Sequence, residues 1–384
     1  MSPRSLFLTF GPVQEYLSQA RRTRDLWAGS YLLSYLAAHA LHAARQADRH
    51  IQVRVPSLAG NALFEAVEAV ASGRQPQSPG ERVGSVPHVA EIEVPDSVQP
   101  REVADAAIKG WREAWQHVAD AVRGYAQHRF PGWTPATSAL WEQQVNPTEM
   151  WTATWVVNAD DMRRRKTLRN FTRLDVQGEK CTVCGARQAL HGGDDRRQGV
   201  RAFWSSVADV LGDMEIQTEG RERLCAPCTI KRLYPLVAPQ ALGWAVQSGY
   251  PSTTTMATLP WRGRVLEKGQ TSEALRRAVA EYVRTLRGLG IPKLLDATRF
   301  PGLHAAARQW GTQREAALEF LSYDGDWLDE DSIRAGAGDA ERAQRLLAAF
   351  SKLAHTAAEG GVSPSGTSYA LLAMDGDNMG NVLR

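Results

Sequence analysis

The sequence predicts an α+β protein in which strands and helices alternate first, a polar cysteine-bearing segment follows, and helices dominate the second half. Two observations carry this prediction: apolar residues change from strand spacing to helical spacing along the chain, and the four cysteines fall in two close pairs. The chain has 384 residues, of which 43% are apolar and 23% charged, which is typical of two or three globular domains. It contains neither a long unbroken apolar run nor a signal-peptide core, so we expect a cytoplasmic protein with no membrane contact.

The first part of the chain reads as β-α-β-β-α-β. The strands are short apolar or alternating runs, and the helices carry apolar residues at helical spacing. The predicted strands cover residues 5–10, 51–55, 88–94 and 151–157, and the predicted helices cover residues 24–47 and 102–128. This order is that of a ferredoxin-like fold. We therefore predict a ferredoxin-like domain over residues 1–175.

A metal site is predicted from the cysteines. They form two C-x-x-C pairs with 40 residues between them: Cys181, Cys184, Cys225 and Cys228. Four thiolates at such spacing are the ligand set of a closed tetrahedral zinc site, with free structural cysteines as the alternative. A site with four protein ligands leaves no open position, so its role is structural. We predict a zinc-binding module over residues 176–235 and a mainly helical region over residues 236–367.

A second candidate site follows the last apolar strand of the sequence. Asp375 and Asp377 are two residues apart, so in an extended segment both carboxylates point to one face and can bind Mg²⁺ or Mn²⁺. Gly376 and Asn378 are candidates for contacts with nucleotide phosphates. A solvated Asp-Gly turn is the alternative. We expect residues 368–384 to be the first strand of a further domain that continues beyond this sequence.

Two other acidic motifs are expected to be structural. Asp324-Gly-Asp326 repeats the same tripeptide, and we favour a simple turn there. Gly192-Gly-Asp-Asp195 lies between the cysteine pairs, beside His191 and two arginines, with no apolar strands to form a rigid hairpin. We therefore interpret it as a loop of the zinc-binding module.

Two basic segments are candidate contacts for nucleic acid. Arg21, Arg22 and Arg24 precede Trp27, a mixture suited to phosphate pairing and base stacking, although a basic helix start before a packed tryptophan explains it too. The run Arg163-Arg-Arg-Lys166 could follow a nucleic-acid backbone, and a solvated helix face explains it nearly as well. The net charge of only +3 argues against a uniformly basic surface.

Together these motifs resemble those of the large palm-domain subunit of type III CRISPR effector complexes, specifically the III-B (RAMP module) branch. The resemblance covers nearly the whole chain, and the order of the motifs makes it specific. It rests on Gly11-Pro-Val-Gln14, Ala20-Arg-Arg-Thr-Arg-Asp-Leu-Trp-Ala-Gly-Ser30, the two cysteine pairs, Tyr250-Pro-Ser-Thr253 before Pro260-Trp261, Asp324-Gly-Asp326 and Ala373-Met-Asp-Gly-Asp-Asn-Met-Gly380.

The family is similar to adenylyl and diguanylate cyclases, with two ferredoxin-like palms that face each other. Its second palm binds ATP and metal and makes cyclic oligoadenylates, which signal antiviral defence, when the guide complex recognises target RNA. The resemblance implies that residues 1–175 are the first, degenerate palm and residues 368–384 the first strand of the catalytic palm. It also implies that Asp375 and Asp377 bind the catalytic metal and that ATP is the substrate. The implied partners are the other complex subunits, guide RNA and target RNA.

The chain departs from the family pattern in two ways. The catalytic Gly-Gly-Asp-Asp hairpin should follow Asp377, but the sequence ends at Arg384, which is expected of a fragment or of a truncated gene product. None of the nine histidines is followed by aspartate, so a His-Asp nuclease activity is not expected. We expect this chain alone to make no oligoadenylate. The alternatives are a noncatalytic scaffold that contacts RNA and a free-standing zinc-ribbon nucleic-acid binder.

Overall fold

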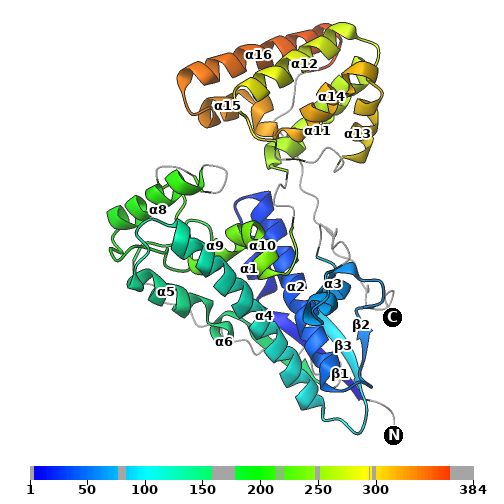
Figure 1. Ribbon diagram of the computed structural model, residues 1–384, viewed down its shortest axis with the longest axis vertical. Helices are drawn as coiled ribbons and strands as arrows, with labels where there is room; N and C mark the ends of the chain where they lie inside the picture. Colours follow the sequence, from blue (N-terminus) through cyan, green and yellow to red (C-terminus); the bar gives the residue numbers. More distant parts are fainter. Residues whose placement is uncertain are drawn as a thin grey trace. The chain divides into compact units, whose positions relative to one another are not determined.

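The computed structural model describes residues 4–76, 84–157, 178–212, 216–217, 220–246, 251–293, 295 and 300–363. The chain divides into two compact units (Figure 1). Of these residues, the ones within 4–21 and 25–246 belong to the first unit, and the ones within 22–24 and 251–363 belong to the second. Among all these residues, no helix combines the length and the apolar character needed to cross a membrane.

The first unit contains a small antiparallel sheet. Its described strands are β1 (Arg4–Gly11), β2 (Gln52–Val55), β3 (Val89–Val94) and β4 (Thr152–Val156). They lie in the order β2-β3-β1-β4, so that β1 and β3 are central. The register pairs Leu8 of β1 with Ala90 of β3 on one side and with Trp155 of β4 on the other. Directly paired residues point to the same face of a sheet, so these three side chains share one face.

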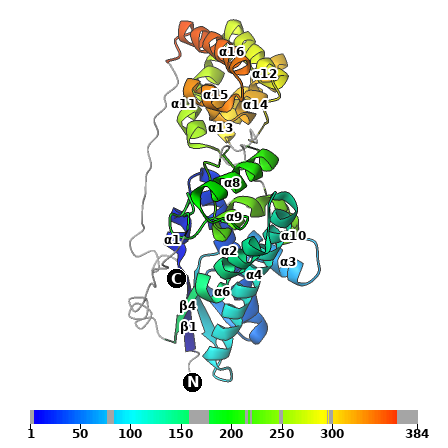
Figure 2. The same cartoon turned by 90° about the vertical axis from the view of Figure 1, so that its left-hand side faces the viewer.

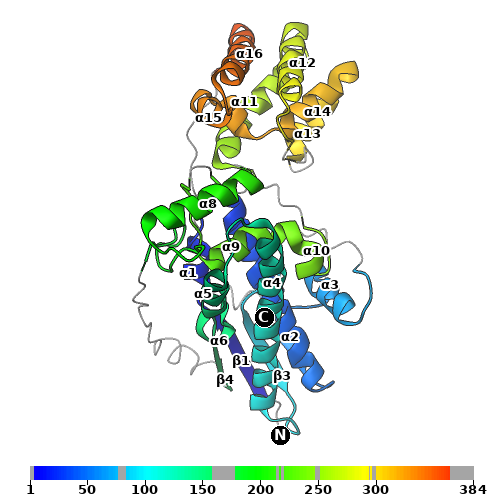
Figure 3. The same ribbon diagram turned by 60° about the vertical axis from the view of Figure 1, so that its left-hand side comes forward.

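Two long helices, α2 (Thr23–Ala47) and α4 (Pro100–Arg129), lie over one face of this sheet (Figure 3). The helices of the first unit that the structure describes are α1 (Val13–Ser18), α2 (Thr23–Ala47), α3 (Ala62–Ala71), α4 (Pro100–Arg129), α5 (Pro135–Val145), α6 (Pro147–Met150), α8 (Arg197–Leu211), α9 (Ala226–Leu233), the 3₁₀ helix η1 (Tyr234–Val237) and α10 (Ala238–Ala241). Helix α4 starts at Pro100, whose fixed φ suits the first helical position. The ring of Phe10 in β1 stacks on Trp111 of α4 with 4.2 Å between the ring centroids, which joins the sheet to α4.

All six elements predicted from residue spacing are present, and the mixed α/β class is confirmed. Helix α3, between β2 and β3, was not predicted. It begins after Asn61, whose side chain accepts a hydrogen bond from the Phe64 backbone N–H at 3.0 Å. The helix buries Leu63, Phe64 and Val67. Asparagine followed by apolar residues at this spacing is the signal that could have revealed the helix.

The cysteine-bearing region shares its core with the sheet. Its buried residues belong to the same hydrophobic cluster as β1, α2 and α4. In α8, Trp204 donates its indole N–H to the Leu190 carbonyl at 2.9 Å and packs edge-on against Phe130, which follows α4. The region is therefore fixed to the helical layer of the first unit by buried aromatic contacts.

A close approach of α2 and α4 depends on Gly110. A Cβ atom there would lie 2.6 Å from the Cβ of Ala43 and 2.8 Å from the carbonyl oxygen of His39. We expect Gly110→Ala to lower the free energy of unfolding by about 1–3 kcal/mol, because the two helices must separate. Gly124→Ala in the same helix is the control, since no atom lies within 4 Å of its added Cβ. Urea unfolding should show the control to be neutral or stabilising, and equal loss in both variants would contradict the prediction.

The second unit is helical over its described residues. Its helices are α11 (Thr253–Gly269), α12 (Glu273–Gly288), α13 (Pro301–Arg308), η3 (Gly311–Gln313), α14 (Arg314–Ser322), η4 (Gly325–Leu328), α15 (Glu330–Gly336) and α16 (Ala340–Glu359). Helices α12 and α16 pack side by side (Figure 2). The ring of Trp261 in α11 contacts Phe320 of α14 and Phe350 of α16, which centres the core on these three helices.

A buried carboxylate in this unit predicts an acid-sensitive stability. Glu319 of α14 is 9% exposed, and although burial alone would raise its pKa, hydrogen bonds from Arg287, Lys293 and Tyr323 lower the pKa to about 2. The ionised Glu319 therefore contributes to the stability of the folded state above the ordinary pKa near 4.5, and this contribution is lost as the pH falls toward 2. We expect Glu319→Gln to remove on the order of 1 kcal/mol of this pH dependence, because solvent screens the partly exposed partners. Unfolding measured from pH 5 to pH 2 should show this, with Glu281→Gln as an exposed control.

Candidate metal centre

The first cysteine pair lies in a tight turn. The backbone N–H of Gly185 donates to the carbonyl oxygen of Cys181 at 2.9 Å, and Gly185 has a φ of 65°, a conformation that favours glycine. The backbone N–H of Cys181 donates to the Arg187 carbonyl at 2.8 Å. These bonds hold Cys181 and Cys184 at the two ends of one turn.

The second pair lies at the start of α9. Cys225 is the N-cap residue, and Cys228 belongs to the first turn, so the two thiols fall on the same side of the helix. The Cys225 side chain makes no capping hydrogen bond. Its sulfur atom instead lies among the other thiols.

Backbone hydrogen bonds tie the two pairs together. The N–H of Thr182 donates to the Arg223 carbonyl, and the N–H of Leu190 donates to the Leu224 carbonyl, both at 2.8 Å. The Arg223 guanidinium also pairs with Glu179 at 3.0 Å. Residues on either side of the long spacer are thereby placed next to each other, which brings the four thiols together.

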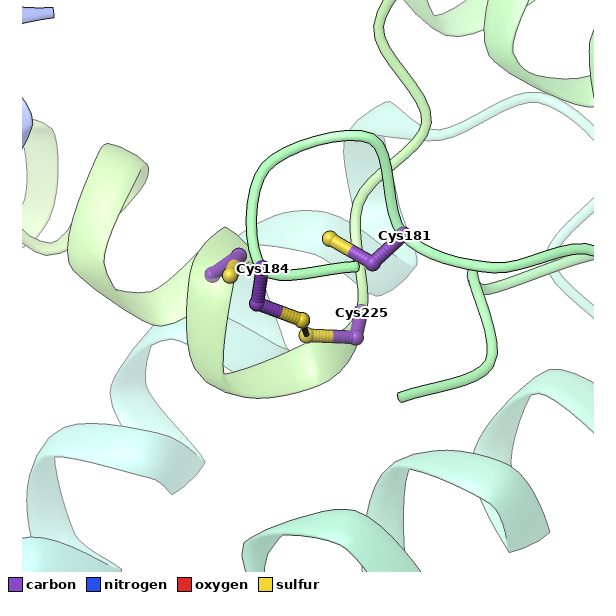
Figure 4. A group of neighbouring side chains, drawn as sticks. Cys181, Cys184 and Cys225 are labelled. Atoms are coloured by element: carbon purple, nitrogen blue, oxygen red, sulfur yellow. Dashed lines mark hydrogen bonds between the residues drawn. The ribbon is translucent and has the colours of Figure 1, made fainter. Parts of the chain in front are cut away.

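The four sulfur atoms have the spacing of a tetrahedral thiolate site. All four Sγ atoms lie within 4.8 Å of one another, and those of Cys184 and Cys225 are 3.7 Å apart (Figure 4). Four sulfurs at the usual zinc–sulfur bond length sit about 3.8 Å apart at the corners of a tetrahedron. A disulfide would need about 2.05 Å. The residues present therefore fit a bound metal ion such as zinc.

The electrostatics of the cluster favour a bound cation. Hydrogen bonding from Cys181 lowers the pKa of Cys184, the least buried of the four, whereas burial raises the pKa of the Cys225 thiol. Several thiolates cannot share so small a buried volume unless a cation balances their charge. The cluster is thus a site that stabilises the local fold when metal is bound. With four protein ligands it has no open position for a substrate.

The Gly192-Gly193-Asp194-Asp195 motif is a loop, as predicted. Asp194 accepts hydrogen bonds from the backbone N–H of Arg196 at 3.0 Å and from its guanidinium at 2.9 Å, just before α8. These local bonds occupy the Asp194 carboxylate, which is the behaviour of a turn residue.

The Asp324-Gly325-Asp326 motif is also a turn, as predicted. Asp324 is the N-cap of η4 and accepts the Asp326 backbone N–H at 3.0 Å. The sequence did not show that the turn packs on the start of α11. Ser252 donates to Asp324 at 2.5 Å, and the Gly325 N–H donates to the Thr255 hydroxyl at 2.7 Å. Two motifs that lie far apart in the sequence are thus in direct contact.

The N-terminal signature, by which we mean residues 11–30 with both N-terminal motifs, contains a packed tryptophan and a buried ion pair. Trp27 is 7% exposed and packs against Tyr31, which agrees with the packed-tryptophan alternative. Asp25, between the arginines and Trp27, is buried and binds Arg232 of α9. The sequence gave no indication of this pairing, because the partners are 207 residues apart.

Several predicted residues lie outside the described part of the chain. These are Asp375, Gly376, Asp377 and Asn378, together with the basic run at residues 163–166. Their roles stay predictions.

Residues 6–120 match the family described as CRISPR-associated protein Cmr2, N-terminal. This segment of the chain is Cmr2-like. The match confirms the resemblance inferred from the sequence motifs. No curated protein matches the chain by sequence.

Solved structures of Cmr-beta are similar to the chain. The first is the cryo-EM structure of Type III-B Cmr-beta in the apo state, with a TM-score of 0.50 and 14% identity over 95% of this chain and 43% of that one. The second is Type III-B Cmr-beta bound to cognate target RNA, with a TM-score of 0.44 and 15% identity over 73% of this chain and 39% of that one. The chain therefore spans less than half the length of these relatives. At such identity the apo match shows a similarity of fold alone.

The Cmr2-like segment runs from β1 through most of α4. It contains both N-terminal motifs, residues 11–14 and 20–30. The cysteine site and the second unit lie after the Cmr2-like segment.

Proposed function

We propose that the chain is part of the large subunit of a type III-B CRISPR RNA-guided effector complex in the cytoplasm. The observation that carries this proposal is the Cmr2-like segment over residues 6–120. The motifs that follow it, from the cysteine pairs to Asp375, occur in the order of the family. Its partners would be the other subunits of the complex and, through them, guide RNA and target RNA.

The sheet of the first unit supports the proposal of a ferredoxin-like palm over residues 1–175. Strands and helices follow in the order of that fold, and the strand order β2-β3-β1-β4 places the first and third strands at the centre. We assign the zinc-binding module to residues 176–235, the helical region to residues 236–367 and the first strand of the second palm to residues 368–384. Zinc is the metal that best suits four cysteine ligands.

The proposed activity of the complete subunit is the synthesis of cyclic oligoadenylate from ATP when target RNA is recognised. Asp375 and Asp377 would bind Mg²⁺ or Mn²⁺, and Gly376 and Asn378 would lie at the ATP phosphates. Mg²⁺ held by one or two carboxylates relies on substrate phosphates to complete its shell. Asp375 and Asp377 by themselves would therefore hold ATP only weakly.

The test uses the complete subunit assembled with its partner subunits and guide RNA. We expect Asp375→Ala to abolish the formation of oligoadenylate from labelled ATP in the presence of target RNA. In-line transfer loses the metal ion that stabilises the attacking and leaving oxygens, which should cost at least about a thousandfold in rate.

Asp331→Ala is the matched control, because the Asp331 side chain is 97% exposed. It should leave synthesis unchanged. Full synthesis by the Asp375→Ala complex would show that this aspartate does not bind the metal. A wild-type complex that binds target RNA and makes no product would favour the noncatalytic scaffold instead. Synthesis by the 384-residue chain alone would show that the catalytic residues are elsewhere.

A further inference from the structure

Helix α9 connects the cysteine site to the N-terminal signature. It starts with Cys225 and Cys228 and carries Lys231 and Arg232 in its last turn. These two cations follow Cys228 by three and four residues, about one helical turn. Both are buried, with 2% and 4% of their surfaces exposed. Buried cations are rare unless they are paired, so the partners of these two side chains show which segments α9 stabilises.

Lys231 holds the end of α1. Its Nζ donates to the carbonyl oxygens of Tyr16 and Gln19, the latter at 2.7 Å, and lies 4.1 Å from the centre of the Tyr16 ring. Carbonyls at a helix C-terminus have no partner within the helix, so the ammonium group caps α1. Gly29 of α2 makes room for this side chain, since a Cβ there would lie 3.3 Å from the lysine Cε.

Arg232 holds the first turn of α2. Its guanidinium donates to both carboxylate oxygens of Asp25, at 2.5 and 2.7 Å, and to both of Glu222, at 3.1 Å each. These three side chains are only 1–3% exposed. Removing one partner of a buried ion pair leaves an unpaired charge away from solvent, so disrupting the pair between Arg232 and Asp25 is strongly destabilising. The N-terminal signature is therefore held at two points by consecutive residues of one helix.

The start of α9 depends on the cysteines. A helix of two turns is unstable by itself. Its N-cap residue, Cys225, provides no capping hydrogen bond, and the Ala226 N–H bonds instead to the Gln144 side chain at 2.8 Å. A metal ion bound by Cys225 and Cys228 would fix the first turn, and the last turn then follows as a rigid body.

We propose that Lys231 and Arg232 are positioning residues through which metal binding at the cysteine site orders residues 16–25 of the N-terminal signature. Metal binding at the cysteine site would thus stabilise a segment that contains none of the metal ligands. The proposal requires that the four cysteines bind metal, and it does not depend on oligoadenylate synthesis.

Hydrogen exchange of the full 384-residue chain tests this proposal. The zinc-loaded chain is compared with the chain stripped by a chelator, with metal content measured in both. Peptides covering residues 14–21 should exchange at least about tenfold faster after stripping, because Lys231 then holds the carbonyls at the end of α1 less firmly. A peptide covering β3 should lose less of its protection than residues 14–21. Unchanged exchange at 14–21 in the stripped chain, or equal loss in β3, would overturn the proposal.

Two substitutions of Lys231, with one control, separate the effect of the Lys231 hydrogen bonds from the effect of the metal site itself. Lys231→Met should speed exchange at residues 14–21 by a similar factor while the chain keeps one zinc and residues 181–190 stay protected. Arg201→Met, an exposed arginine of α8, is the control and should change neither region. Lys231→Arg should restore part of the protection, because a cation is again available to the carbonyls. Full protection in Lys231→Met would overturn the proposal, and a chain that binds no zinc would also overturn it.

Discussion

The Cys225→Ser variant is expected to lose the bound metal and part of the stability of the first unit. A structural zinc ion contributes on the order of 10 kcal/mol of binding free energy, which a folded cluster of thiols without metal does not replace. The cysteine region shares a core with the sheet, so the loss should extend beyond the two cysteine turns. We expect one zinc per wild-type chain and a fall in thermal midpoint of more than about 10 °C in the variant.

Elemental analysis and thermal unfolding of protein purified without added zinc measure both quantities. Zinc returned after chelation should restore the wild-type midpoint and leave that of Cys225→Ser unchanged, which separates metal loss from a packing defect. A wild-type chain that carries no metal, or a variant as stable as the wild type, would contradict the prediction.

The Gly325→Ala variant should strongly destabilise the second unit. A Cβ at Gly325 would overlap backbone atoms of Thr254 and Thr255 at the start of α11. Backbone cannot move aside as a flexible side chain can, so the turn must separate from α11 and lose the hydrogen bond from the Gly325 N–H to Thr255. We expect a loss of about 3 kcal/mol in the free energy of unfolding.

Gly263→Ala is the matched control for this prediction. Gly263 lies within α11, and an added Cβ there would have no atom within 4 Å. The control should be neutral or slightly stabilising, because alanine favours a helix over glycine. Hydrogen exchange of α11 under increasing urea reports the stability of this unit. Equal protection in Gly325→Ala and the wild type would show that the turn and the helix are not packed as described.

Local patterns were sufficient for the four strands, the two long helices α2 and α4 and the cysteine cluster. Strand and helix spacings are properties of short segments, so they predicted β1 and α4 before any tertiary contact was known. The cysteine spacing predicted a tetrahedral site because ligand geometry depends on a few residues at each end of the spacer. The Asp-Gly-Asp turn was likewise predicted from its own chemistry.

Contacts between distant segments could not be predicted in the same way. Nothing near Arg232 in the sequence indicates Asp25 as its partner, and nothing near Ser252 indicates Asp324. A lysine or arginine in an amphipathic helix is ordinarily solvated, so burial of Lys231 and Arg232 became evident only once the helices were packed. The resemblance to a family supplied the predicted order of domains, and it gave no information on these pairs.

The pairing of Asp25 with Arg232 also bears on how the chain is made. At roughly 5–20 residues per second, a ribosome needs about 10–40 seconds to add the residues that separate the two partners. Over this interval the nascent chain contains the carboxylate of Asp25 without the guanidinium of Arg232. Solvent or a chaperone must accommodate the N-terminal signature until α9 emerges. The start of this protein is thus among the last parts of the first unit to reach its native contacts during synthesis.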